Sequence, residues 1–141
     1  MFQDAQNQYS TAQAVTAAAD STNSIDHQIA RDLGTGRDIY IVVVCTVAMT
    51  DSGSDSTVDV TIQTSADNSS FTKAQTIGTF AAVSAAGTGL FAKLQPGVIN
   101  ARYSNVHYAI NNGNLTTGSF TAFLTTDIQQ YVSYKKGYTI S

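Results

Sequence analysis

Short runs in which apolar and polar residues alternate, separated by clusters of turn-forming residues, recur through the middle of the chain. In one run Val58, Val60 and Ile62 alternate with polar residues. Successive side chains of a strand point to opposite faces, so this run is typical of a strand with one buried and one solvated face. Several short strands with turn signals about every 8–12 residues predict an all-β chain folded as an antiparallel β-sandwich or a barrel.

The segment 37–49 is apolar at both odd and even positions, as expected for a strand covered on both faces. Cys45 lies inside it, which favours a small core residue over a nucleophile. Because this cysteine is alone in the sequence, no internal disulfide can form.

Further strands are expected later in the chain. The sequence Asn111-Asn112-Gly113-Asn114 is a hairpin signal, because Asn-Gly accepts the positive φ values that tight turns need. The following strand should therefore pair back onto the preceding one. The predicted strands are residues 71–77, 79–83 after Gly78, 90–94, 103–110 and 120–125.

The composition supports strands and suggests an assembly role. Thr, Ser, Asn and Gln together make 51 of the 141 residues, glutamate is absent, and charged residues make only 12%. Thr and Val suit a pleated surface, whereas the residues that favour exposed helix faces are scarce. A surface with few charges also loses its water at low cost, and the cores of protein interfaces are poor in charge.

Both ends of the chain differ from the middle. Residues 1–36 hold few long apolar residues and predict an extended N-terminal arm rather than a core element, with a short strand around 9–16. Residues 17–19, all alanine, could instead start a helix, which the turn formers 20–24 would stop. Residues 127–141 lack a long apolar alternation and predict an extended C-terminal tail.

Length and charge exclude several classes of partner. At 141 residues the chain predicts a single domain. The net charge of -3 offers no basic patch for nucleic acid. The longest apolar run, residues 39–49, is eleven residues long, against about 20 for a spanning helix, so no membrane partner is expected. The N-terminus has neither the basic start nor the apolar stretch of a secretory signal.

The candidate motifs for a cofactor or a metal are both incomplete. The step Gly34-Thr35-Gly36 precedes a strand, whereas a dinucleotide loop needs a helix N-terminus. The four-residue spacing of Asp51, Asp55 and Asp59 suggests a calcium loop, but Ile62 stands where a bidentate carboxylate belongs. A solvated loop is the better interpretation, and neither cofactor nor metal is expected.

Catalysis is not expected either. Only His27 and His107 could act as a base near neutral pH, and the alternation around His107 points it outward among polar neighbours. The adjacency of Asp26 and His27 carries little weight, because triads assemble in space. The chain is therefore expected not to be an enzyme.

Candidate contact residues lie near the two ends. Tail tyrosines lose little rotamer freedom when they become ordered, which suits interface anchors, and the tail lysines could meet an acidic partner. The alternative is that the tail is free of contacts, as many termini are. The candidate contact residues are Gln3, Gln6, Gln8, Tyr9, Gln13, Tyr131, Tyr134, Lys135, Lys136 and Tyr138.

The order and spacing of several segments resemble the capsid cement, or decoration, proteins of tailed bacteriophages, of the Bordetella-phage type. The likeness covers about residues 10–129, and residues 130–141 match no family pattern. The segments that carry it are Asp32-Leu33-Gly34-Thr35-Gly36, the strand 39–47, residues 58–65 with Asp67 and Phe71, residues 85–87, Arg102-Tyr103 with Tyr108, and residues 121–127.

This resemblance implies a single jelly-roll domain that lies in the virion, on the outer surface of an icosahedral head. There it would dock as a dimer or trimer and bridge neighbouring major capsid proteins of the HK97-type fold. The resemblance brings no catalytic residues. Alternatives are a phage tail or baseplate accessory domain, or a carbohydrate-binding β-sandwich, which the absence of tryptophan disfavours.

Overall fold

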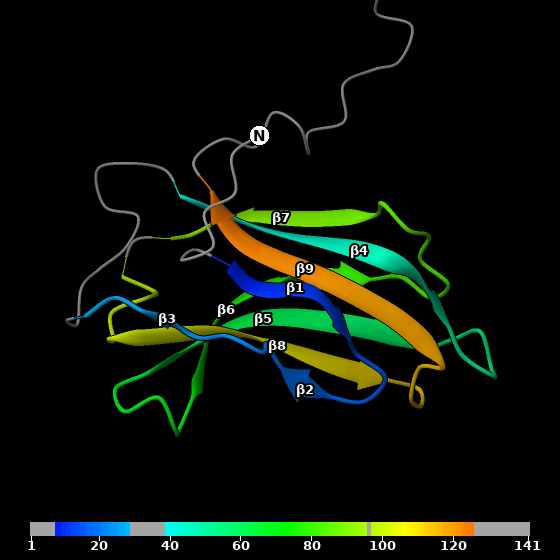
Figure 1. The fold of residues 1–141 in the computed structure, drawn as a ribbon, viewed down its shortest axis with the longest axis horizontal. Helices are drawn as coiled ribbons and strands as arrows, with labels where there is room; N and C mark the ends of the chain where they lie inside the picture. The colour runs from blue at the N-terminus through cyan, green and yellow to red at the C-terminus, as the bar shows by residue number, and fades with distance from the viewer. Residues whose placement is uncertain (1–7, 29–38, 96, 126–141) are drawn as a thin grey trace, which may run out of the picture.

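The computed structural model describes residues 8–28, 39–95 and 97–125. These residues form strands and no helix, which confirms the all-β prediction. The strands make two antiparallel sheets that face one another as a sandwich (Figure 1). Over the same residues there is no helix with the length and apolar character needed to cross a membrane.

The first sheet, called sheet A here, has the strand order β1-β9-β4-β7, and the second, sheet B, has the order β2-β8-β5-β6, with β3 also paired to β8. In sheet A the bounds are Gln8–Ala14 for β1, Thr117–Thr125 for β9, Tyr40–Thr50 for β4 and Gly89–Lys93 for β7. In sheet B they are Ala19–Asp20 for β2, Ile25–Asp26 for β3, Tyr103–Asn111 for β8, Thr57–Ser65 for β5 and Thr72–Phe80 for β6.

The path of the chain between the sheets defines the fold. The short strands β2 and β3 both pair with β8, along the edge that does not face β5. Together they fill one strand position. The chain then visits sheet A with β1, β4, β7 and β9, and sheet B with β2/β3, β5, β6 and β8. This interleaving of two four-position sheets is the jelly roll.

The core lies between the sheets and follows the predicted alternation. Val58, Val60 and Ile62 of β5 are fully buried, as are alternate residues of β4. Val42 of β4 is also fully buried, although it lies on the other face of sheet A, in register with Phe123 of β9. The prediction of a strand covered on both faces is therefore confirmed for residues 41–43 of β4, and it is wrong for residues 46–48, which are exposed. Cys45 belongs to the core, and burial raises the pKa of its thiol.

The short strand predicted around residues 9–16 is present as β1, but the prediction that residues 1–36 form an arm outside the core is wrong for the part that the structure describes. Strand β1 pairs with β9, and both Tyr9 and Val15 belong to the core. The alternation is hidden in the sequence because the register shifts twice along β1, and Ala12, within the second shift, has a φ of 45°. Each irregularity moves the inward-facing position by one residue, so no period of two can be recognised. Residues 1–7 and 29–38 lie outside the described residues.

The predicted hairpin after β8 is also wrong. Asn112 and Gly113 do adopt positive φ values, 66° and 103°, as the sequence indicates. However, β9 pairs with β4 and β1 of sheet A, whereas β8 belongs to sheet B. Leu115, just beyond the turn, is buried, and its N–H donates to the carbonyl of Thr16. The turn therefore redirects the chain from one sheet to the other.

The predicted break at Gly78 is absent, since β6 runs through it from Thr72 to Phe80. A Cβ atom at Gly78 would lie 3.3 Å from the Leu90 methyl groups of β7. The glycine therefore allows the edges of the two sheets to approach one another, which explains its position within a strand.

Candidate interaction surface

Three of the predicted contact residues, Gln8, Tyr9 and Gln13, lie in the described part of the chain. All three belong to β1. The Oε1 atom of Gln8 accepts a hydrogen bond from the hydroxyl of Thr11 at 2.9 Å. The other predicted contacts lie outside the described residues: Gln3, Gln6, Tyr131, Tyr134, Lys135, Lys136 and Tyr138.

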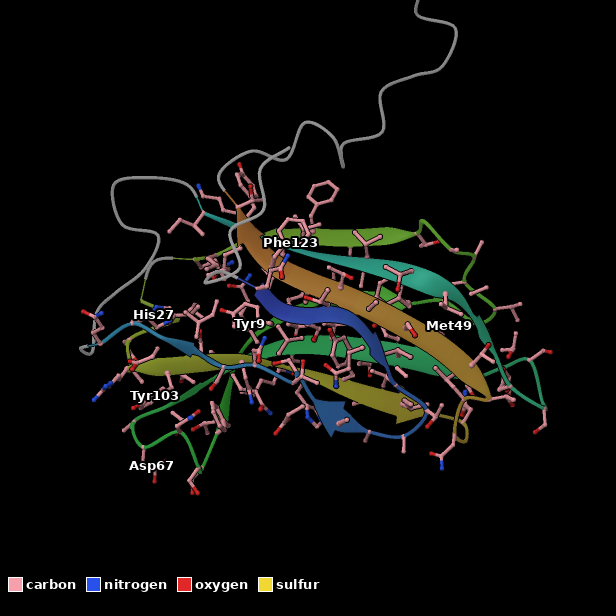
Figure 2. The ribbon with its side chains drawn as sticks, viewed as in Figure 1. Tyr9, His27, Met49, Asp67, Tyr103 and Phe123 are labelled. Carbon is pink, nitrogen blue, oxygen red and sulfur yellow. The ribbon has the colours of Figure 1, made fainter. Side chains whose placement is uncertain are left out.

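Tyr9 cannot serve as the surface contact that the sequence suggested. Its side chain is fully buried between the sheets, and its hydroxyl lies 2.8 Å from the Oγ atom of Ser104 in β8 (Figure 2). The ring packs in the core, although the neighbouring residues in the sequence are polar. The irregular register of β1 places Tyr9 on the inward face of the strand.

Gln13 is half-buried, and its amide holds the N-terminal strands together. The Nε2 group donates to the carbonyl of Asp20 at 2.9 Å, while Oε1 accepts from Ser10 Oγ at 2.8 Å and from the N–H of Thr22 at 2.9 Å. These bonds tie β1 to the segment that contains β2. The amide is thus engaged within the chain.

One polar cluster forms between segments that are distant in the sequence. The fold brings His27 and Ser104 together across 77 residues, with 3.0 Å between His27 Nε2 and Ser104 Oγ. The Ser104 side chain is fully buried and also bonds to Tyr9, so its hydroxyl is enclosed rather than presented to solvent. The cluster joins β1, the end of β3 and β8. Its hydrogen bonds therefore fix the positions of these strands relative to one another. No local sequence signal links the three residues.

The outer face of sheet B carries charged side chains that pair with one another. Arg102 makes two hydrogen bonds to Asp26, with distances of 2.8 Å and 2.9 Å, and its guanidinium lies 5.0 Å from the centre of the Tyr103 ring. Hydrogen bonding to Arg102 lowers the pKa of Asp26 to about 2. His107 points outward, as predicted, with its Nδ1 atom 2.6 Å from Oδ1 of Asp20.

The aspartates considered for calcium have other roles. The described residues contain no group of three or more His, Cys, Asp or Glu side chains that could hold a metal ion. The Asp51 Oδ2 atom accepts hydrogen bonds from the N–H groups of Gly53 and Asp55, both at 3.2 Å, and from Ser56 Oγ at 3.1 Å. These bonds close the loop between β4 and β5.

A second surface, formed by parts of β4 and β7 and the connection from β6, has no charged residue among its exposed residues, and we call it the uncharged patch. It comprises the exposed residues 46–48 of β4, residues 81, 83 and 85–88 of the connection from β6, and residues 89 and 91 of β7. The exposed large hydrophobic side chains found in the described residues all lie in it: Val47, Val83 and Phe91 are 48%, 53% and 44% exposed. Val47 and Val83 lie at the end of β4 where Met49 bonds to Ser84, whereas Phe91 pairs with Val42 farther along the same strand. Grouped exposed apolar side chains mark interaction sites in soluble proteins.

Hydrogen bonds hold the connection between β6 and β7 beside β4, at the right of Figure 1. The N–H of Met49 donates to the carbonyl of Ser84 at 2.9 Å. The backbone N–H of Cys45 donates to the carbonyl of Thr88 at 2.8 Å, and the carbonyl of Cys45 accepts from the N–H of Gly87 at 2.7 Å. The sequence contains one signal that could have located this surface: residues 74–92 include no charged residue.

The span of the fold coincides with a family match. Residues 9–124 match the family model described as Bbp16. The match begins in β1 and ends in β9, and so takes in both sheets and the uncharged patch. No curated protein matches the chain.

Proposed function

The chain belongs to the Bbp16 family, a family of the Bordetella-phage type, and we propose that it is a structural protein of a phage particle. In that particle the protein cements the capsid. In this role it binds the outer surface of the icosahedral head and bridges neighbouring major capsid proteins of the HK97-type fold. The observation that carries the proposal is the family match over residues 9–124. The low charge of the chain and the uncharged patch on its surface support a role in adhesion.

The stabilising mechanism is thermodynamic linkage. A protein that binds the expanded shell more tightly than other shell states stabilises that shell by the difference in binding free energy. A protein with equal affinity for both states would have no effect. The role therefore requires a rigid surface matched to one arrangement of shell subunits, and a jelly roll with a closed core supplies such a surface.

Weak individual contacts suffice when many act together. A protein that touches two or three shell subunits at once gains effective affinity from multivalency. We propose that the protein binds as a dimer or trimer, because a symmetric oligomer repeats the same contact. The proposed role involves no catalysis, cofactor, nucleic acid or membrane.

The test is co-sedimentation with purified phage structures. The purified protein is mixed with heads that lack it and, in parallel, with isolated tails, and each mixture is centrifuged through a sucrose cushion. Saturable binding to heads is expected, with little binding to tails. Binding to tails alone would instead support a tail or baseplate role, and failure to bind heads would overturn the cement proposal.

A further inference from the structure

Val83 has an unfavourable backbone conformation. Residues 82 and 83 form a turn, the Ser84 hydroxyl donates to the carbonyl of Ala81 at 2.6 Å, and Val83 has a φ of 57°. Left-handed backbone is unfavourable for L-residues, and for a β-branched side chain it is a true outlier. The other non-glycine residues with positive φ in the described part are Ala12, Gln28, Ser54, Asn68 and Asn112, none of which is β-branched.

The next turn provides an internal comparison. Gly87 has a φ of 94°, and the N–H of Thr88 donates to the carbonyl of Ala85 at 3.2 Å. A Cβ atom at Gly87 would have open space around it, so crowding does not explain the glycine. Its positive φ does, since glycine adopts it without penalty. The same connection therefore uses glycine at one left-handed position and valine at the other.

Packing within the chain does not explain the valine. The side chain is 53% exposed, whereas an apolar residue that compensates for backbone strain is expected to be buried. Val83 projects from the uncharged patch, and the bond from Met49 to Ser84 fixes the backbone beside it. Strained residues that persist in a rigid setting concentrate at binding and catalytic sites. An exposed apolar side chain held in a costly conformation suits insertion into a pocket of a partner.

We propose that the uncharged patch is the surface that docks on the protein shell of the head, with Val83 as its apolar anchor. This inference rests on the cement role proposed above and assigns that role to particular residues. The occupant is the shell protein, through an uncharged pocket on its outer face. Because neither the patch nor its anchor carries charge, the contact depends on apolar burial and is only weakly sensitive to salt.

The size of the patch favours the shell over a second copy of this chain. The patch contains eleven exposed residues, whereas a stable interface of standard size uses about 20–30 residues on each side. A patch of this size is too small to hold a dimer by itself. It is sufficient as one of many equivalent contacts on a lattice, where multivalency adds the remaining affinity.

The test compares two substitutions at Val83 with a matched control on the other sheet. Val83→Gly removes the anchor and relieves the backbone, and Val83→Asp places a charge in the patch. Thr76→Asp places the same charge on an exposed residue of β6 in sheet B. Melting temperatures verify folding, and fluorescently labelled protein reports binding to heads at about 0.1 M and about 1 M NaCl.

We expect Val83→Gly to melt at or above the wild-type temperature yet bind heads at least about tenfold more weakly, with Val83→Asp weaker still. Thr76→Asp should bind like the wild type, and salt should change the wild-type affinity little. If the wild type binds heads and both Val83 variants bind equally well, the anchor assignment is wrong and the cement role stands. If light scattering finds that Val83→Asp dissociates an oligomer without weakening head binding, the patch joins copies of this chain instead, which also overturns the assignment. Failure of the wild type to bind heads would overturn the cement role itself.

Discussion

Two tyrosines buried in the core, Tyr9 and Tyr108, should make the stability of this protein fall steeply at alkaline pH. Both side chains are fully buried, and their hydroxyls bond to Ser104 at 2.8 Å and to Ser10 at 3.0 Å. Burial raises the pKa of Tyr108 to about 12, although the bond to Ser10 opposes the rise. Burial raises the pKa of Tyr9 even further above its ordinary value, again against the hydrogen bond.

The sign and size of the effect follow from linkage. In the unfolded chain each tyrosine loses its proton at a pKa of about 10, whereas the folded state keeps both protons up to about pH 12. Above pH 10 the unfolded state therefore binds fewer protons than the folded state, and the free energy of unfolding decreases as the pH rises. Each tyrosine contributes about 1.4 kcal/mol per pH unit, so the two together contribute about 2.7 kcal/mol per unit between about pH 10 and 12.

The assay is urea unfolding followed by circular dichroism at pH steps from 8 to 12. Tyr9→Phe should cost about 1 kcal/mol at neutral pH, since Ser104 keeps its contact with His27, but should halve the alkaline slope. Tyr108→Phe should also halve the slope, and the double variant should remove most of it. An unchanged slope in both single variants would refute the burial argument.

Four further substitutions test the packing and the backbone. Phe120→Ala should lower the free energy of unfolding by about 3–5 kcal/mol in urea titrations, because the ring is fully buried and lies 5.0 Å from that of Phe80. Asn105→Val should raise it by about 1 kcal/mol, because the Asn105 side chain is only 3% exposed and its Oδ1 atom has no hydrogen-bond partner; a loss of stability would indicate that the amide is satisfied. Val83→Gly should raise the free energy of unfolding by about 0.5–1 kcal/mol, because the relief of left-handed strain exceeds the entropy that glycine adds to the unfolded chain. Gly87→Ala should lower the free energy of unfolding by about 1 kcal/mol, because alanine is strained at the positive φ of this position. Calorimetric melts that show the opposite signs would contradict the strain argument.

The strands in the middle of the chain could be predicted because their signal is local. The alternation in β5 and the apolar run in β4 are visible in the sequence, and both strands lie where it placed them. Pairing is not local, which is why the Asn112-Gly113 turn was predicted to close a hairpin. The conformation of the turn follows from its two residues, but the sheet that β9 joins depends on β4, more than sixty residues earlier.

The N-terminal strand and the candidate surface show the same limit. The irregular register of β1 conceals Tyr9 among polar neighbours, so neither its burial nor its bond to Ser104 could be inferred from the sequence. The uncharged run 74–92 is visible in the sequence, but the left-handed φ of Val83 and the position of the connection beside β4 are not. Those properties arise from hydrogen bonds between segments that are distant along the chain.

The most direct test of the cement role is the melting of phage heads that lack this protein, measured with and without added purified protein. Bound protein stabilises each site by an amount that grows with its concentration relative to the dissociation constant, about 2.7 kcal/mol at a hundredfold excess. The melting temperature of the heads should therefore rise with added protein and level off when the sites are filled. Identical melting temperatures with and without saturating protein would contradict the proposed role.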